Sequence, residues 1–450
     1  MPSIWFKKIA SEFRFQGFCF RQPFRSKTAH ISLAAIFVAL LLQGCGGGGT
    51  PGSPAPVIDF SKYRIGTAPD PLEVAPIFSD RFTDDPTANP TDFDYREVDS
   101  PSMIDDPGRN SETAPNSGIC NSLLCDRYML FYEATDNLGV NSIGLITSSE
   151  YDFDIILQDR TRLLQASDLP DLDFGGNIES ALNATDPTVV LDKSNPYGTA
   201  GRYRMWLEGT YGAGGTLSAI LTCESADGLT WSAPQLCTGL DLGPEFGNVS
   251  RIVDPDVVLV EDPAEQYRMI FEVIRNDGSA VLGMASSLDG IDWTVTDGVF
   301  TEDSAGPVFS GGPGAFDDGA IRSPSLGIER DEITDEILEW HLFYEGQPIN
   351  FQIDNDSFIG YSNSTDGFSW SGYAIPVISP TSDLTQVEAF DSDDVKHPDI
   401  FMRVPDTFDP ANNPEPDFSK FVLYYSGDPE FSGSGSVSAE VNRIGLATAE

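Results

Sequence analysis

The hydrophobic residues of this chain fall into short runs that are separated by long polar segments. The runs are rich in Val, Ile, Tyr, Phe and Trp and are bounded by Gly, Asp, Asn and Pro, which is typical of β-strands. No convincing helical period is found beyond the first 56 residues. The pattern therefore predicts an all-β fold.

The hydrophobic runs recur in the same order in five successive units. A first run opens each unit directly after a proline, at Pro101, Pro187, Pro255, Pro324 and Pro398. A second run follows, as in RYMLFYEA and RYRMWLEG, and then a third, as in SIGLITSS and AVLGMASS. In the middle three units the third run leads into a turn of the form Ser-x-Asp-Gly-x-x-Trp, at Ser225, Ser287 and Ser364.

Self-similar units of this kind are typical of repeat folds, and four-stranded sheets repeated radially form a β-propeller. We therefore predict a five-bladed β-propeller of four-stranded antiparallel blades, starting near residues 93, 179, 246, 316 and 390. The last unit stops after its third strand, so a segment within 57–82 is expected to supply the fourth. In the repeated turn, Asp and Gly shape the backbone and Trp is expected to pack between neighbouring sheets.

The first 44 residues differ from the rest of the chain. A long basic stretch precedes an apolar run that is too short to span a bilayer, which predicts a signal peptide. The run ends in Leu-Gln-Gly-Cys45, which resembles the lipobox of bacterial lipoproteins, whose Cys is lipidated. An ordinary signal peptide with a chance Cys is the alternative.

Residues 45–56 form a Gly/Pro/Ser-rich tether, so the propeller, 57–450, is expected to be anchored to a membrane of the bacterial cell envelope. The residue after Cys45 is Gly46 and not Asp, which favours the outer membrane, on its periplasmic or surface face.

Four cysteines remain beyond Cys45. An even number in an oxidising compartment predicts two local disulfides, Cys120–Cys125 and Cys223–Cys237. Metal binding is the alternative, but these spacings are not those of zinc sites.

The composition is strongly acidic, with a net charge of −44. The leader holds six basic residues and one acidic residue, so the rest has 20 Lys and Arg against 69 Asp and Glu, a net charge of −49. Such a surface disfavours nucleic acids and anionic polymers as partners. Adaptation to salt and binding of divalent cations are both compatible with it.

The innermost strands of a propeller converge at one end of the central channel, and the runs that follow the prolines are the best candidates for these strands. We therefore expect one site to gather the residues that precede each proline, namely Asp99, Ser100, Asp186, Asp254, Arg322, Ser323, Lys396 and His397.

From about Asp94 onward the units, with their Asp-Pro openings and Ser-x-Asp-Gly-x-x-Trp turns, resemble glycoside hydrolase families 43 and 32 and their relatives, a superfamily of arabinanase-, levansucrase- and invertase-like enzymes. The resemblance implies a glycan substrate and carboxylate acid/base hydrolysis. Asp186 and Asp254 match the Asp-Pro pattern, whereas Asp99 is one residue out of register, which turns a strand side chain to the other face. No Glu occupies the expected acid position. Glu245 is the nearest substitute, and either Glu245 or Asp99 is expected to be the catalytic partner of Asp186 and Asp254. Arg322, Lys396 and His397 are then expected to hydrogen-bond sugar hydroxyls.

Each of these assignments has a structural alternative. Asp-Pro pairs also shape turns, and Glu133, Glu208, Glu272 and Glu345 recur at the ends of second strands, which favours a structural role for them. The resemblance to arabinanases makes His397 a weak candidate to hold a cation such as Ca²⁺, although no cofactor is required. A carbohydrate-binding or structural propeller without turnover is therefore the alternative to an enzyme.

A Phe-Asp pair leads into three of the units, with Asp94, Asp317 and Asp391 at a constant distance from the following proline. We interpret these residues as framework elements and not as part of a site.

Overall fold

The computed structural model describes residues 58–449 with breaks. The longer breaks are 66–72, 80–88, 110–125, 154–159, 297–315, 349–355, 382–389, 403–419 and 429–441, and a shorter one is 243–245. The predicted leader, Cys45 and the tether lie outside the described residues, as do Cys120, Cys125 and Glu245. The described residues all belong to one compact unit, Ile58–Glu450.

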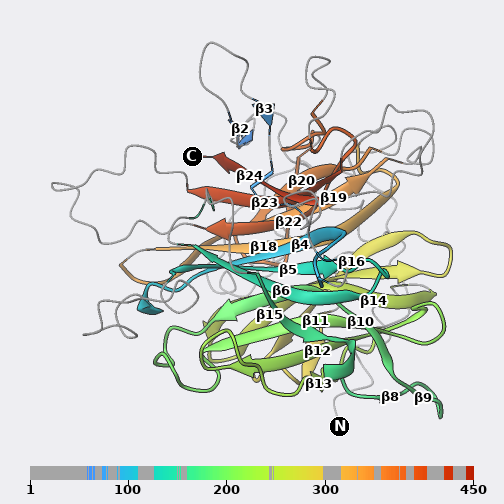
Figure 1. Ribbon diagram of the computed structural model, residues 1–450. Coiled ribbons are helices and arrows are strands. Elements are labelled where there is room, and N and C mark those ends of the chain that lie inside the picture. The colour runs from blue at the N-terminus through green and yellow to red at the C-terminus, as the bar shows by residue number, and fades with distance from the viewer. Residues whose placement is uncertain are drawn as a thin grey trace, which may run out of the picture. The chain divides into compact units, whose positions relative to one another are not determined.

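The blades are five four-stranded antiparallel sheets (Figure 1). Contacts between the first strands of successive sheets close them into a ring, so the predicted five-bladed propeller is confirmed. Blade 1 contains β4 (Glu97–Asp105), β5 (Tyr128–Thr135), β6 (Asn141–Ser148) and β7 (Thr161–Gln165). Blade 2 contains β10 (Ala181–Leu191), β11 (Tyr203–Tyr211), β12 (Leu217–Ser225) and β13 (Gln235–Leu236). Blade 3 contains β14 (Val249–Asp262), β15 (Glu265–Arg275), β16 (Ala280–Ser287) and β17 (Trp293–Val295).

Blade 4 contains β18 (Ala320–Arg330), β19 (Ile337–Gln347), β20 (Phe358–Ser364) and β21 (Ser371–Gly372). Blade 5 contains β22 (Asp394–Met402), β23 (Phe421–Asp428), β24 (Arg443–Ala449) and β1 (Ser61–Lys62). Two short hairpins lie outside the blades, formed by β2 (Arg64–Ile65) with β3 (Glu73–Val74) and by β8 (Leu172–Asp173) with β9 (Ile178–Glu179).

The ring is closed by a strand from the other end of the chain, as predicted. In β1, Ser61 pairs with Thr448 and Lys62 with Ala447 of β24. The Lys62 ammonium also donates to the Ser379 carbonyl at 2.6 Å and forms an ion pair with the buried Asp391.

The hydrophobic core is divided into five clusters, each between two neighbouring blades. Successive side chains of a strand point to opposite faces, so in β5 Phe131 packs toward blade 2 while Tyr132 packs toward blade 5. Both faces of a blade are therefore buried, which explains why the second runs of the sequence are almost continuously hydrophobic.

A cyclic set of hydrogen bonds joins the innermost strands. The side chain that follows each proline accepts the backbone N–H of the next blade, at distances between 2.5 and 3.3 Å. The five acceptors are Ser102, Thr188, Asp256, Ser325 and Asp399. Because all five blades take part, each blade is fixed to both of its neighbours at the axis.

The repeated turn has the predicted structure. In its first copy, the Asp227 carboxylate accepts the backbone N–H groups of Leu229 and Thr230, and Gly228 has a φ of 75°. The tryptophans pack against the preceding blade: Trp231 contacts Phe131, Trp293 contacts Trp206, and Trp370 lies in the cluster between blades 3 and 4. The turn therefore joins neighbouring blades.

The Phe-Asp pairs are framework elements, as interpreted from the sequence. In each, the Asp accepts a hydrogen bond from a buried tyrosine of the second strand and the Phe packs against the same ring. The tyrosine partners of Asp94, Asp317 and Asp391 are Tyr132, Tyr344 and Tyr425.

The predicted disulfide between Cys223 and Cys237 is wrong, because both residues are buried free thiols. Cys237 lies opposite Ile220, an odd number of residues from Cys223, and side chains alternate along a strand. Cys223 therefore faces the core between blades 1 and 2, whereas Cys237 faces the core between blades 2 and 3.

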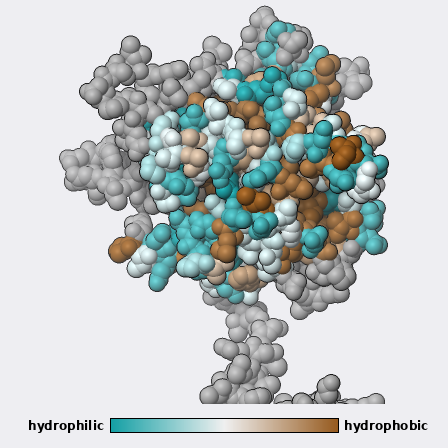
Figure 2. All heavy atoms as spheres, turned by 90° about the horizontal axis from the view of Figure 1, so that it is seen from below, coloured by the Kyte–Doolittle hydropathy of each residue, from teal (hydrophilic) through white to brown (hydrophobic). Residues whose placement is uncertain are grey.

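Hydrophilic and hydrophobic residues are interspersed on the face shown in Figure 2. The most exposed large hydrophobic side chains in the described residues, such as Leu138, Ile178 and Ile333, come from different blades or loops. Single exposed hydrophobic residues are normal for folded proteins. Within the part of the chain described, no helix has the length and apolar character needed to cross a membrane.

Candidate functional site

The five innermost strands share an uncommon backbone conformation at one position. The residue before each proline has a positive φ: Ser100 (44°), Asp186 (47°), Asp254 (47°), Ser323 (40°) and His397 (44°). The register with the second strand breaks at the same point in every blade, as in a β-bulge. Proline lacks the N–H that a ladder requires and is confined to sheet edges and bulges, so the X-Pro pair specifies this bulge.

The bulges surround the mouth of the central channel. A cavity of about 680 Å³ opens there, lined by Asp99, Glu133, Asp186, Glu208, Asp254, Glu272 and Glu345, together with Arg251, Arg322, Lys396 and His397. Below this cavity the channel becomes narrower. The space that remains there has a volume of about 40 Å³ and is lined by the five prolines and the residues beside them. The predicted convergence of the innermost strands is therefore confirmed.

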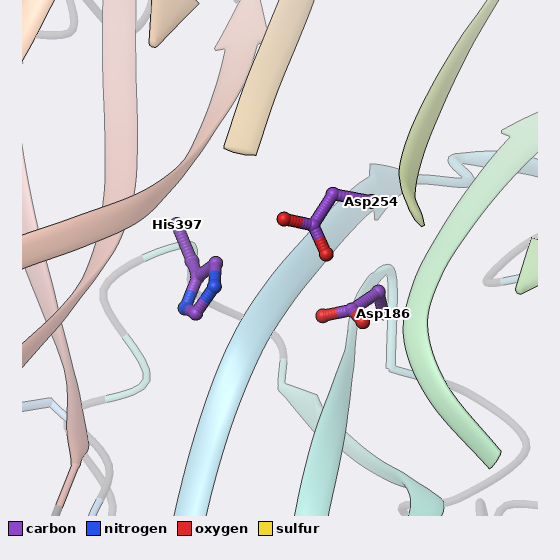
Figure 3. A group of neighbouring side chains, drawn as sticks. All are labelled: Asp186, Asp254 and His397. Carbon is purple, nitrogen blue, oxygen red and sulfur yellow. The ribbon is translucent and has the colours of Figure 1, made fainter. Parts of the chain in front are cut away.

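Asp186 and Asp254 come from neighbouring blades and lie side by side at this mouth (Figure 3). The Ser100 hydroxyl donates to Asp186 at 2.7 Å, and the Ser323 hydroxyl donates to Asp254 at 3.0 Å. Burial and the neighbouring Asp254 charge raise the pKa of Asp186 to about 7, and burial and the Glu272 charge raise the pKa of Asp254 to about 7. The two carboxyls therefore titrate together near neutral pH and can share one proton.

His397 lies beside the pair and is bound to Asp99, with 2.7 Å between His397 Nδ1 and the carboxylate. Burial opposes charge on both groups, but their attraction raises the pKa of His397 and lowers that of Asp99. Asp99 also accepts from the Asn442 amide at 2.6 Å and from the Ser100 N–H at 2.8 Å. The Asp99 carboxylate is thus ionised and already engaged by three donors.

Two further cations from the sequence prediction also line the cavity. The Arg322 guanidinium donates to Glu272 at 2.7 Å and to Gln347 at 3.1 Å. Burial disfavours the charged form of Lys396, but Asp99 and Glu345 raise its pKa above the ordinary value. These side chains neutralise part of the acidic wall.

The recurring glutamates, interpreted from the sequence as structural, line the cavity in all four blades. Glu133 accepts the N–H of Asp186 at 3.3 Å, and Glu272 accepts the N–H of Ser323 at 3.2 Å. Each of these two carboxylates therefore holds the strained residue of the next blade, which bears out the structural interpretation for them.

Glu208 differs from the other glutamates. Its side chain is almost fully buried, and within the described residues no group hydrogen-bonds to its carboxyl. Burial, followed by the charges of Asp186 and Asp254, raises the pKa of Glu208 well above its ordinary value. These surroundings favour the neutral form of Glu208. The pKa of Glu133 is also raised well above its ordinary value, so the lack of a hydrogen bond from the described residues to the carboxyl is what sets Glu208 apart, and the sequence repeat gives no sign of it.

The channel mouth could also hold a cation. Ligand atoms of Asp186, Asp254 and His397 lie within 4.8 Å of one another. Carboxylate oxygens suit Ca²⁺, but His397 is protonated beside Asp99 and would first have to lose its proton. The three side chains therefore fit a cation only in part, and hydrolysis by the carboxyl groups of this cavity does not require one.

Neither a protein-family model nor a curated protein sequence matches the chain. Solved structures that resemble it include the catalytic domain of the Coprinopsis cinerea GH62 α-L-arabinofuranosidase, with 12% identity over 87% of this chain and 97% of that chain and a TM-score of 0.48. Another is an N-acetylgalactosamine deacetylase from F. plautii in complex with blood group B trisaccharide, with 14% identity, 83% and 94% coverage and a TM-score of 0.48. A glycosyl hydrolase from Bacteroides ovatus shows 16% identity, 79% and 84% coverage and a TM-score of 0.47.

Proposed function

We propose that this protein is a glycoside hydrolase whose substrate binds in the cavity at the channel mouth. One observation carries the proposal: the buried Glu208, whose surroundings favour its neutral form, lines the same cavity as Asp186 and Asp254, whose pKa values are raised to about 7. Glycoside hydrolysis needs one carboxyl that donates a proton and one that accepts it. Environments that separate the pKa values of neighbouring carboxyls assign these two roles.

In this reaction Glu208 donates its proton to the glycosidic oxygen while the bond from that oxygen to the anomeric carbon breaks. The ionised member of the Asp186–Asp254 pair takes a proton from the attacking water, whose oxygen forms the new bond to the anomeric carbon. Glu208 is left as a carboxylate and the aspartate pair holds one extra proton. The pair releases this proton to solvent and Glu208 takes one up, which restores both groups before the next cycle. Asp99 is not assigned the base role, because three donors already engage its carboxylate.

The cavity favours a neutral glycan. The chain as a whole has a net charge of −44, so an anionic polymer would be repelled before it reached the cavity. The Thr210 hydroxyl and the Gln347 amide lie on its wall together with Arg251 and Lys396. These groups offer the donors and acceptors that sugar hydroxyls require.

The proposal is tested by reducing-sugar release from arabinans, xylans, fructans and mannans, with the Asp186→Asn variant assayed in parallel. We expect the wild type to degrade at least one polymer and the variant to be slower by a factor of about 10² to 10⁴, the range that general acid–base catalysis contributes. Equal release by both proteins would indicate a contaminating activity and contradict the assignment.

A carbohydrate-binding propeller without turnover is the second candidate, favoured by the many hydrogen bonds that already engage Asp99, Glu133, Glu272 and Arg322. Oligosaccharide binding measured by calorimetry, without release from any polymer, would support this function instead.

We also propose that Cys45 carries a lipid and anchors the propeller to a membrane of the cell envelope, most simply the outer membrane. The proposal rests on the sequence that precedes Cys45 and on the tether that follows it. Mass spectrometry of the mature N-terminus is expected to find a lipid-modified Cys45. A Cys45→Ser variant should then be released into the soluble fraction, and its retention in the membrane fraction would contradict the proposal.

A further inference from the structure

A second group of charged side chains lies on blade 4, away from the channel mouth. Glu329 belongs to the C-terminal end of β18, whereas Arg322, at the cavity, precedes it by seven residues of the same strand. At about 3.3 Å per residue this places the group about 23 Å from the cavity wall. The group is therefore independent of the proposed hydrolytic site.

Strand register brings three potential ligands together. Glu329 pairs directly with Glu339 of β19, and His341 is two residues further along β19, on the same face. One ligand atom from each of these side chains lies within 4.8 Å of the other two.

His341 is 1% exposed, and no group in the described part of the chain hydrogen-bonds to its Nε2. The nearest carboxylate oxygen, Glu329 Oε2, is 3.5 Å from Nε2, which is too long for a hydrogen bond. A buried polar atom without a partner is costly, so a group bound to Nε2 at this position would be stabilising.

The 3.5 Å separation fits two ligands of one metal ion. With metal–nitrogen and metal–oxygen bonds of about 2.0 to 2.1 Å, two ligands of a tetrahedral Zn²⁺ ion are about 3.3 Å apart. Imidazole nitrogen and carboxylate oxygen are both zinc ligands, and three protein ligands leave the fourth position of a tetrahedral ion for water.

Neighbouring side chains orient these ligands. His341 Nδ1 lies 2.8 Å from the Tyr361 hydroxyl, and the Asn363 amide donates to Glu339 at 2.6 Å. When Nδ1 donates its proton to Tyr361, the lone pair of Nε2 points toward the two carboxylates. Second contacts of this kind fix the ring tautomer and the carboxylate geometry at metal sites.

We propose that Glu329, Glu339 and His341 bind a divalent transition-metal ion, with Zn²⁺ the best fit, and thereby tie β18 to β19. The Lys420 ammonium, 2.6 Å from Glu329 Oε2, compensates this carboxylate in the absence of metal. The Lys420 side chain is 37% exposed, so it can move into solvent when the ion binds.

The test is calorimetric titration of the full chain with Zn²⁺, comparing Glu339→Gln with Asp254→Asn, which alters only the channel group. We expect Glu339→Gln to weaken one binding event at least tenfold and Asp254→Asn to leave that event unchanged. Lys420→Met should strengthen it, because the competing ammonium is removed. Co²⁺ added to the wild type should give the visible absorption of a tetrahedral site, and Glu339→Gln should lose it.

Two results would overturn the proposal. One is the absence of Zn²⁺ binding by the wild type. The other is binding that persists at full strength in both Glu339→Gln and Glu329→Gln, which would assign the ion to the channel group or to cysteines elsewhere in the chain.

Discussion

Replacing Glu208 with Gln is expected to lower the rate of glycan hydrolysis by a factor of about 10² to 10⁴. Gln has nearly the same shape as Glu but cannot donate an acidic proton to the leaving oxygen. Because no group within the described residues hydrogen-bonds to the Glu208 carboxyl, the change should leave the blade intact. The measurement is kcat and KM on the polymer that the wild type degrades.

The identity of the leaving group distinguishes an acid from a merely structural residue. An aryl glycoside with an acidic leaving phenol needs little protonation, so Glu208→Gln should lose far less activity on it than on the polymer. Glu272→Gln provides the comparison, because Glu272 holds the backbone of Ser323 and should affect both substrates alike. Equal losses on both substrates for Glu208→Gln would exclude an acid role.

Replacing Asp254 with Asn is expected to stabilise the fold at pH 8 by roughly 1 to 4 kcal/mol, since each pKa unit corresponds to about 1.4 kcal/mol. The folded pKa of Asp254, about 7, lies above the ordinary value of 3.8. Between these values the folded state binds more protons than the unfolded chain, so this residue makes stability fall as the pH rises from about 4 to 7. Asn remains neutral and removes that loss.

Urea denaturation at pH 4 and pH 8 measures this effect as the difference in unfolding free energy between variant and wild type. We expect the difference to be small at pH 4 and large at pH 8. The exposed Asp241→Asn variant is the control and should change stability little at either pH. A stabilisation by Asp254→Asn that is the same at both values would show that Asp254 is not held protonated by its surroundings.

The fold could be predicted because the same sequence patterns recur in successive blades. The X-Pro pairs marked the innermost strands, the incomplete last unit predicted closure by a segment before blade 1, and Ser-x-Asp-Gly-x-x-Trp marked contacts between blades. Repetition also showed that the residues before the prolines would meet at one mouth.

The parts that could not be predicted depend on which face a side chain occupies. The spacing of Cys223 and Cys237 suggested a pair, but strand register places their thiols in different cores. Glu133, Glu208 and Glu272 occupy equivalent positions, yet only the structure shows that two of them hold the next blade while Glu208 faces two buried aspartates. The sequence repeat identifies residues that hold the blades together. It does not show that one residue of the repeated set, Glu208, has different surroundings.

The closure of the ring by β1 has a mechanical consequence. Any pulling force on the chain ahead of Ser61 acts first on a strand whose ladder to β24 comprises two residue pairs. Ladder bonds alone would be opened one after another by such a load. The Lys62 side chain adds a second attachment, because its ammonium contacts Ser379, Thr381 and the buried Asp391 carboxylate. Ile58 and Phe60 also pack against the core between blades 4 and 5, so together with Lys62 they form the attachment through which tension would enter the propeller.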